Sequence, residues 1–252
     1  MITEDRLEAG LRESTARLAD VVANSDGATH IPTCPEWSLR QLATHVGRAH
    51  RWSGEMVNRR ATGMLPFREA PDGKLPEDPA AWPGWLIAGA GRLADAVSQA
   101  GAEPVWTFTG MAPAGFWLRR MAHETVVHAA DAELAVDRQV TIPADVAADG
   151  IAEWFEMVSG DGDGQGPPLA EGKTLHVHAT DSGLDGTGEW LLARTPSGLS
   201  VQAGHAQADV VVRGPAASLL LVLQRRLPPA TPGVEVLGDD SVLTGWLGNT
   251  KF

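Results

Sequence analysis

The residue pair with the most chemical content is Glu124 and His128, four positions apart in a long helical segment. At this spacing two side chains project from the same face of a helix, one turn apart. A carboxylate oxygen and an imidazole nitrogen are ligands that suit zinc, with bonds of about 2.0–2.2 Å. Such a pair is also common by chance. It is equally compatible with a buried carboxylate–histidine contact that binds no metal.

Two further features favour a metal site. The helical stripe that begins with the apolar Trp117 carries Glu124, His128 and Asp131, so these polar side chains should face the interior. An unpaired carboxylate there would be costly, and a cation removes that cost. His45, beside the apolar face of an earlier helix, supplies a third ligand. Three ligands from two packed helices leave a fourth position open, as catalytic zinc sites do.

The single cysteine and the remaining histidines are weaker candidates. Cys34 precedes a helix and could be a nucleophile, but a small buried side chain that anchors its loop is the favoured interpretation. His176 and His178 alternate along a strand, so both could face one side and bind a metal; a solvated strand face is favoured. The others are assigned to a loop (His30), the helix surface (His50, His123) and a turn (His205).

Composition limits the classes of function. The chain has 252 residues, and its formal net charge of −12 disfavours binding to nucleic-acid phosphates or to a membrane through a polybasic anchor. One cysteine excludes an intramolecular disulfide and favours a reducing cytoplasm. The acidic N-terminal residues predict no secretory signal, and no apolar run is long enough to predict a transmembrane helix.

The periodicity of apolar residues predicts two domains. Helical spacing is expected over residues 3–24, 38–60, 78–97, 113–137 and 143–158. A Gly- and Asp-rich connection follows over residues 159–168. The period then changes to two, which predicts strands over residues 175–179, 188–195, 199–203, 208–212 and 234–237, with helices over 215–224 and 240–247. The fold class is therefore an all-α bundle over residues 1–158 followed by a small α+β domain over residues 169–252.

Two segments around the proposed ligands resemble signatures of the mycothiol-dependent maleylpyruvate isomerase family. They are CPEWSLRQLATHV, residues 34–46, and RMAHETVVHAAD, residues 120–131. The resemblance covers essentially the whole chain and implies a DinB-like four-helix bundle joined to a sterol-carrier-like domain. The family's metal ligands match His45, Glu124 and His128. Its functional arginine follows a leucine-rich helix, where Arg225 is the better match and Arg226 the alternative.

The resemblance also implies an activity. Zinc would favour the thiolate form of a low-molecular-weight thiol such as mycothiol. The thiolate would attack a small-molecule electrophile, in a maleylpyruvate-isomerase-like cis–trans isomerase or in a thiol S-transferase, and an arginine would hold a carboxylate. Nickel, cobalt or iron would fit similar ligands. The alternatives are a non-catalytic small-molecule-binding module and a metal-free interaction protein in which Glu124 and His128 form a buried pair.

Overall fold

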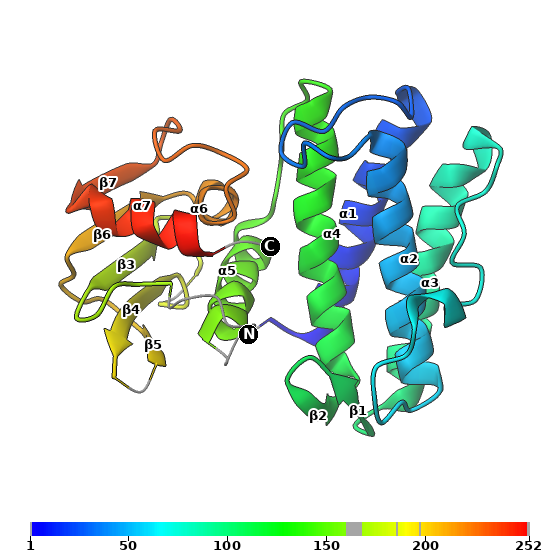
Figure 1. Ribbon diagram of the computed structural model, residues 1–252, viewed down its shortest axis with the longest axis horizontal. Helices are drawn as coiled ribbons and strands as arrows, with labels where there is room; N and C mark the ends of the chain where they lie inside the picture. The colour runs from blue at the N-terminus through cyan, green and yellow to red at the C-terminus, as the bar shows by residue number, and fades with distance from the viewer. Residues whose placement is uncertain (1, 160–167, 185, 197, 251–252) are drawn as a thin grey trace. The chain divides into compact units, whose positions relative to one another are not determined.

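The computed structural model describes residues 2–159, 168–184, 186–196 and 198–250. The chain divides into two compact units, Met1–Thr141 and Ile142–Phe252 (Figure 1). The first is helical and the second is a smaller α+β unit, as the periodicity predicts. Within the described ranges, no helix is both long and apolar enough to cross a membrane.

The first unit is a bundle of four long helices: α1 (Glu4–Asn24), α2 (Leu39–Asn58), α3 (Trp82–Ala100) and α4 (Gly115–Ala135). Local signals set their first turns. The Thr3 side chain accepts from the Arg6 amide at the start of α1, and Ser38 and Gln41 form the expected capping box of α2. The predicted third helix begins with a separate 3-10 turn, η2 (Pro79–Ala81), which the Asp78 side chain caps. A second 3-10 turn, η1 (Phe67–Glu69), lies in the loop after α2.

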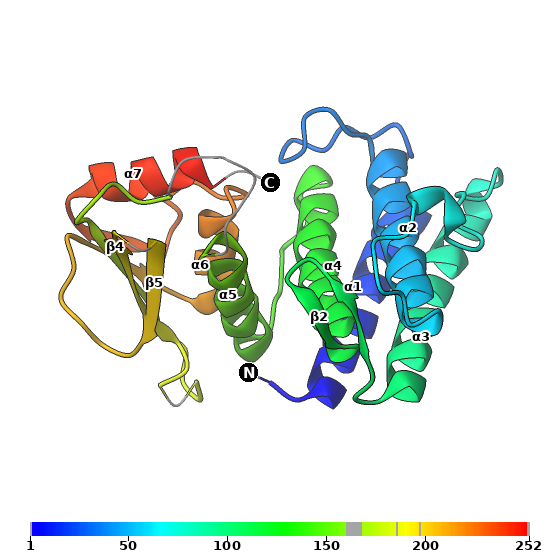
Figure 2. The same ribbon diagram turned by 60° about the horizontal axis from the view of Figure 1, so that its bottom comes forward.

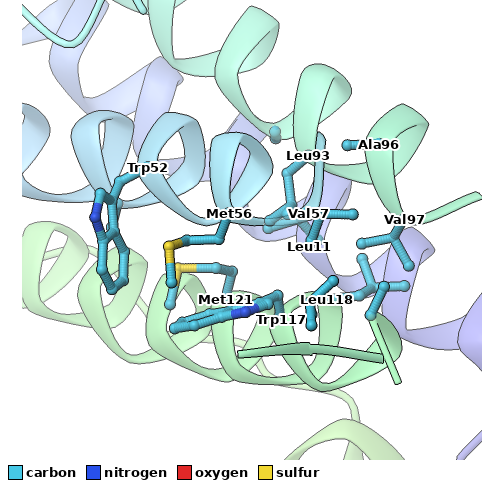
Figure 3. Close-up of a cluster of buried hydrophobic side chains, with 14 of the residues drawn as sticks. Leu11, Trp52, Met56, Val57, Leu93, Ala96, Val97, Trp117, Leu118 and Met121 are labelled. Carbon is cyan, nitrogen blue, oxygen red and sulfur yellow. The ribbon is translucent and has the colours of Figure 1, made fainter. Parts of the chain in front are cut away.

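Two clusters of buried apolar side chains hold the bundle together. Figure 3 shows part of the first, with Trp52 and Met56 of α2 facing Trp117 and Met121 of α4. The second includes Leu18, Leu42, Val46, Leu86 and Ala129. Both clusters contain side chains of α1, α2, α3 and α4, so burial of apolar surface fixes the helices that carry the proposed ligands.

A short hairpin between α3 and α4 was not among the predicted elements. Its strands are β1 (Pro104–Thr107) and β2 (Gly110–Pro113), which pair antiparallel. The indole nitrogen of Trp117 donates to the Trp106 carbonyl at 2.9 Å, which ties the hairpin to α4. Four-residue strands flanked by proline give too short an alternation to be recognised in a sequence.

In the residues that the structure describes, the second unit contains a five-stranded sheet and three helices. Figure 2 shows α5, α6 and α7 with strands β4 and β5. Its elements are α5 (Ala144–Ser159), β3 (Thr174–Ala179), β4 (Glu189–Thr195), β5 (Gly198–Ala203), β6 (Val210–Gly214), α6 (Ala216–Leu223), β7 (Glu235–Gly238) and α7 (Asp240–Asn249). The strand order is β5-β4-β3-β6-β7; β3 and β6 are parallel and the other neighbours antiparallel.

The boundary between the units differs from the expected one. The Gly- and Asp-rich composition after residue 158 predicts that α5 ends the helical bundle. The compact units instead divide at Thr141 and Ile142, so α5 belongs to the second unit. There the Phe155 ring contacts Trp190 of β4 and Trp246 of α7 at centroid distances of 5.9 and 5.7 Å. Composition marks a connection but does not say which core a flanking helix joins. Residues 160–167 of that connection lie outside the described part of the chain.

Candidate functional site

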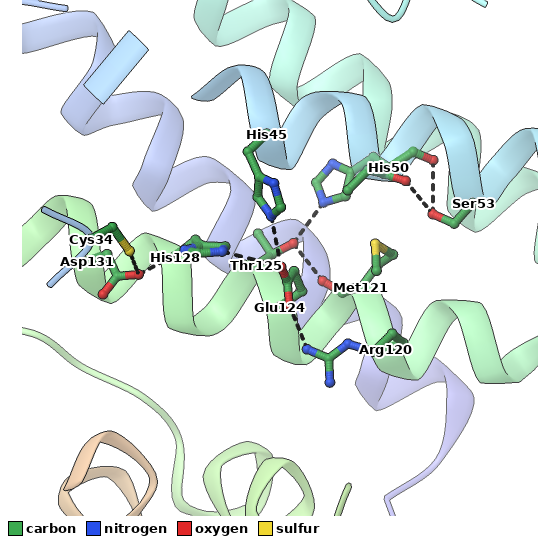
Figure 4. A network of polar contacts seen from close by, with 11 residues as sticks. Cys34, His45, His50, Ser53, Arg120, Met121, Glu124, Thr125, His128 and Asp131 are labelled. Carbon is green, nitrogen blue, oxygen red and sulfur yellow. Dashed lines mark hydrogen bonds and ion pairs between the residues drawn. The ribbon is translucent and has the colours of Figure 1, made fainter. Parts of the chain in front are cut away.

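Helices α2 and α4 bring the three expected ligands together (Figure 4). The Nε2 atom of His45 lies 2.9 Å from Glu124 Oε1, and the Nε2 atom of His128 lies 3.3 Å from the same oxygen. One possible ligand atom from each residue lies within 4.8 Å of the other two. The four-residue spacing on α4 therefore places Glu124 and His128 on one face, as predicted, and α2 adds His45 from across the interface.

The two carboxylate oxygens of Glu124 have different partners. Oε2 accepts from the Arg120 guanidinium at 2.8 Å, so Oε1 is the oxygen that meets the histidines. Burial would raise the pKa of Glu124, but the contacts with His128 and His45 and the charge of Arg120 hold it well below its ordinary value. The cluster therefore contains an ionised carboxylate at neutral pH. Arg120 was not predicted as a site residue, although its position four residues before Glu124 is a signal that could have found it.

A second carboxylate fixes the His128 ring. The Nδ1 atom of His128 lies 2.8 Å from Asp131 Oδ2, so its Nε2 atom points to Glu124. Burial alone would lower the pKa of His128, but hydrogen bonds with Asp131, Cys34 and Glu124 raise it well above its ordinary value. A carboxylate on the far nitrogen is the arrangement that orients most metal-ligating histidines. Asp131 appears on the predicted polar stripe, but its partner is evident only in the structure.

The loop before α2 supplies two more side chains to the site. The Cys34 sulfur lies 3.6 Å from Asp131 Oδ2, which a thiol S–H can reach as a weak donor. Cys34 is half-buried, so it is neither an inert core residue nor a fully exposed thiol. The Trp37 ring lies against His45 and His128, with centroid distances of 4.8 and 5.7 Å. Trp37 therefore forms an apolar wall beside the two imidazoles.

The expected surface position of His50 and His123 is wrong, because both are buried, at 0% and 1% exposure. The helical period predicts which way a side chain points, but not how many neighbours enclose the helix. The His50 Nε2 atom lies 2.7 Å from the Thr125 hydroxyl, which itself donates to the Met121 carbonyl at 2.6 Å. The hydroxyl has one proton, so His50 is the donor in this pair. Burial lowers the pKa of His50 to about 3, which keeps the ring neutral.

The two candidate arginines lie just after α6 in the second unit. Arg225 is exposed and adopts a left-handed backbone conformation, with φ of 61°. Its side chain makes no hydrogen bond or ion pair with the residues that the structure describes. The Arg226 guanidinium donates to the Gln224 carbonyl at the end of α6, at 2.9 Å, and so caps the C-terminus of this helix. Arg225 thus has the freer guanidinium of the two, and its role stays a prediction.

Comparison with protein families identifies both units. The model of the mycothiol maleylpyruvate isomerase N-terminal domain matches residues 9–133, and that of the corresponding C-terminal domain matches residues 145–245. The chain belongs to the mycothiol maleylpyruvate isomerase family. The N-terminal match ends before the division between the compact units, and the C-terminal match begins after it.

Solved structures agree with this family fold. The crystal structure of a mycothiol-dependent maleylpyruvate isomerase is similar at a TM-score of 0.58, with 19% identity and 93% of each chain covered. A histidine-to-alanine variant of that isomerase gives a TM-score of 0.60, again with 19% identity and 93% coverage of both chains. Among curated proteins, none matches the chain. At this identity the structural likeness establishes the fold.

Proposed function

We propose that this family member is a metal-dependent enzyme that activates a low-molecular-weight thiol, such as mycothiol, for attack on a small-molecule electrophile. The observation that carries the proposal is the convergence of His45 and His128 on one oxygen of Glu124. These are the residues onto which the family's ligands fall when its two motifs are matched to the sequence. The small-molecule partners and the single cysteine also favour a reducing cytoplasm as the place of action.

The donor set fits a divalent ion. Two imidazole nitrogens and one carboxylate oxygen form a zinc-type set of three with room for an exogenous ligand. The ionised Glu124 and the raised pKa of His128 indicate that the cluster favours a positive charge, which a metal ion would supply in place of a proton. Asp131 would act as the carboxylate that orients His128. When bound, zinc would stabilise the thiolate form of a thiol at neutral pH.

The surrounding residues support chemistry of this kind. The His45 side chain is 36% exposed, so a small thiol can reach the cluster from that side. Trp37 provides an apolar wall that limits water around His45 and His128. Because the net charge is −12, an anionic substrate needs a local cation, and we assign that role to Arg225, with Arg226 as the alternative.

Two reactions share this activation. In an isomerase, the sulfur adds to a conjugated double bond of a cis-diacid, and the electron pair moves onto the adjacent carbonyl. Rotation about the new single bond and departure of the thiolate then re-form the double bond in the trans product. In an S-transferase, the sulfur stays on the product and a leaving group departs with its electron pair. The site residues serve both, so the electrophile decides between them.

The test combines metal content with thiol-dependent turnover of a panel of maleyl-type diacids and alkylating electrophiles. Glu124→Ala should lose the metal ion of the His45–Glu124–His128 cluster and the activity. His50→Gln changes a buried histidine of α2 that contacts Thr125 of α4. This variant should keep the metal ion and the activity. Activity that survives complete metal removal would contradict the proposal. A tightly retained small molecule, without metal or turnover, would favour the binding-module alternative.

A further inference from the structure

A second cluster of histidines around a carboxylate lies on the sheet of the second unit. This sheet histidine cluster comprises His176, His178, Glu189 and His205. His176 and His178 share one face of β3, since alternate residues of a strand point the same way, and Glu189 of β4 is the register partner of His178. His205 follows β5 in a loop that Gly204 fastens to β4 through a 3.0 Å bond from its amide to the Glu189 carbonyl.

The side chains converge on the two oxygens of Glu189. His205 Nδ1 lies 2.8 Å and His176 Nε2 3.2 Å from Oε2, and His178 Nε2 lies 3.8 Å from Oε1. Possible ligand atoms of His176, Glu189 and His205 all lie within 4.8 Å of one another. Zinc bonds of about 2.0–2.2 Å would put donor atoms roughly 3–4 Å apart, so small side-chain rotations would complete the arrangement.

The surroundings of His176 indicate a bound metal ion independently of the distances. The side chain is 1% exposed, and neither ring nitrogen has a hydrogen-bond partner among the described residues. Its Nε2 atom is close to Glu189 Oε2 but not aligned for a hydrogen bond. An imidazole nitrogen without a hydrogen-bond partner can donate its lone pair to a metal ion. A buried imidazole that faces a carboxylate without a hydrogen bond has an unused lone pair that a bound cation would satisfy.

The surrounding charges permit a cation. The Glu189 carboxylate faces the rings of His176, His178 and His205. Arg213 of β6 is the parallel register partner of His178, and its guanidinium is paired with Glu235 of β7 at 3.4 Å. That ion pair reduces the repulsion that Arg213 would exert on a nearby metal ion.

We propose that the sheet histidine cluster is a second metal site, with His176, Glu189 and His205 as ligands and His178 available as a fourth. Nitrogen-rich sets of this kind suit zinc and the neighbouring first-row divalent ions, and not calcium or magnesium. Four protein ligands would make this a closed, structural site, in contrast to the open position expected in the bundle. The ion would join β3, β4 and the loop after β5.

The test is a calorimetric titration of zinc into the metal-free full-length chain carrying Glu124→Ala, which disables the bundle cluster. About one ion should bind. Adding His205→Gln should weaken that binding by about tenfold or more. Adding His30→Gln, at an exposed histidine outside both clusters, should change nothing. Calcium should not bind.

Absence of zinc binding to the Glu124→Ala chain would overturn the proposal, as would equal affinity in the His205→Gln and His30→Gln versions. His205→Gln and His30→Gln would also be made in the chain that keeps Glu124. This control separates loss of the site from misfolding caused by Glu124→Ala. There, His205→Gln should remove about one bound ion per chain and His30→Gln none. The His205 side chain is 77% exposed, so its replacement should not threaten the fold.

Discussion

Two histidines of α2 face α4 and differ in what they meet there. His45 lies 2.9 Å from the Glu124 carboxylate, and its side chain is 36% exposed. His50, five residues later, lies 2.7 Å from the Thr125 hydroxyl and is fully buried (Figure 4). A histidine that lies beside a carboxylate and can be reached from solvent is placed to bind a metal ion. A histidine enclosed with a hydroxyl is held neutral and contributes to packing and hydrogen bonding.

Residue type and helix position therefore do not distinguish the two roles. Glu124 and Thr125 are adjacent in sequence, yet one turns towards His45 and the other towards His50. The charge of the partner and the exposure of the imidazole separate them. Exchanges at the two positions should therefore have opposite signatures, with loss of metal chemistry at one and loss of stability at the other.

The largest effect should come from Glu124→Gln. The amide keeps the size of the side chain but removes the charge that faces both histidines, so the affinity for a cation should collapse. We expect thiol-dependent turnover to fall by on the order of 100-fold or more, since loss of a ligand should cost at least as much as loss of an outer-shell partner. Steady-state kinetics with a fixed thiol and electrophile would measure it. A decrease in turnover of less than threefold would show that Glu124 is not a metal ligand.

A smaller effect is expected for Asp131→Asn, which keeps a hydrogen-bond acceptor near His128 Nδ1 but removes the charge. The affinity of the site for zinc should fall by about 10–100-fold, the range typical of a partner that orients a metal ligand. Competition with a chromophoric chelator would give the change in affinity. Unchanged affinity would mean that Asp131 serves packing alone.

His50→Gln should lower stability without affecting the metal site. Metal content should stay the same, while the free energy of unfolding falls by about 1–3 kcal/mol because a buried hydrogen bond is disturbed. Chemical denaturation and elemental analysis of the same sample would separate the two effects. Metal loss with unchanged stability would show that His50 belongs to the metal site.

The same exchange should alter how stability depends on pH. The pKa of His50 is about 3 in the folded chain and about 6.5 when unfolded, so below pH 6.5 the unfolded state binds a proton that the folded state excludes. His50 therefore makes stability fall with decreasing pH, by up to about 1.4 kcal/mol per pH unit between pH 6 and 3. The free energy of unfolding of His50→Gln should decline less steeply over this range. Parallel curves would contradict the assignment of His50 as a neutral buried group.

The smallest effect should be that of Cys34→Ser. The thiol lies 3.6 Å from Asp131 Oδ2 and also interacts with the His128 ring, but it is not one of the three proposed ligands. Turnover should change by about two- to fivefold, equivalent to one weak hydrogen bond. Abolished turnover with intact metal content would make Cys34 a nucleophile and shift the chemistry from an external thiol to the chain itself.

Much of the fold follows from local signals in the sequence. The cap at Thr3, the capping box of Ser38 and Gln41, and the change of period after the glycine-rich segment predict helices and strands close to their observed limits. Such signals do not predict the hairpin of β1 and β2, nor that α5 belongs to the second unit. The hairpin strands are too short to show a period, and α5 joins the second unit through the contacts of Phe155, which only a folded core reveals.

The proposed site was predictable in its ligands and not in its surroundings. The spacing of Glu124 and His128 and the family motifs identify three residues that the structure brings together. The pairing of Asp131 with His128, the wall formed by Trp37 and the enclosure of His50 depend on distances between helices. A helical period gives the direction of a side chain, whereas its partner across an interface requires the packing.

Elemental analysis of the purified chain would show directly whether His45, Glu124 and His128 hold a metal ion. Wild type, Glu124→Ala and His50→Gln would be compared after zinc loading and exhaustive dialysis, with the sheet histidine cluster disabled in each by His205→Gln. We expect about one zinc ion per chain in the first and third proteins and none in the second. No metal in any of them, or equal metal in all three, would contradict it.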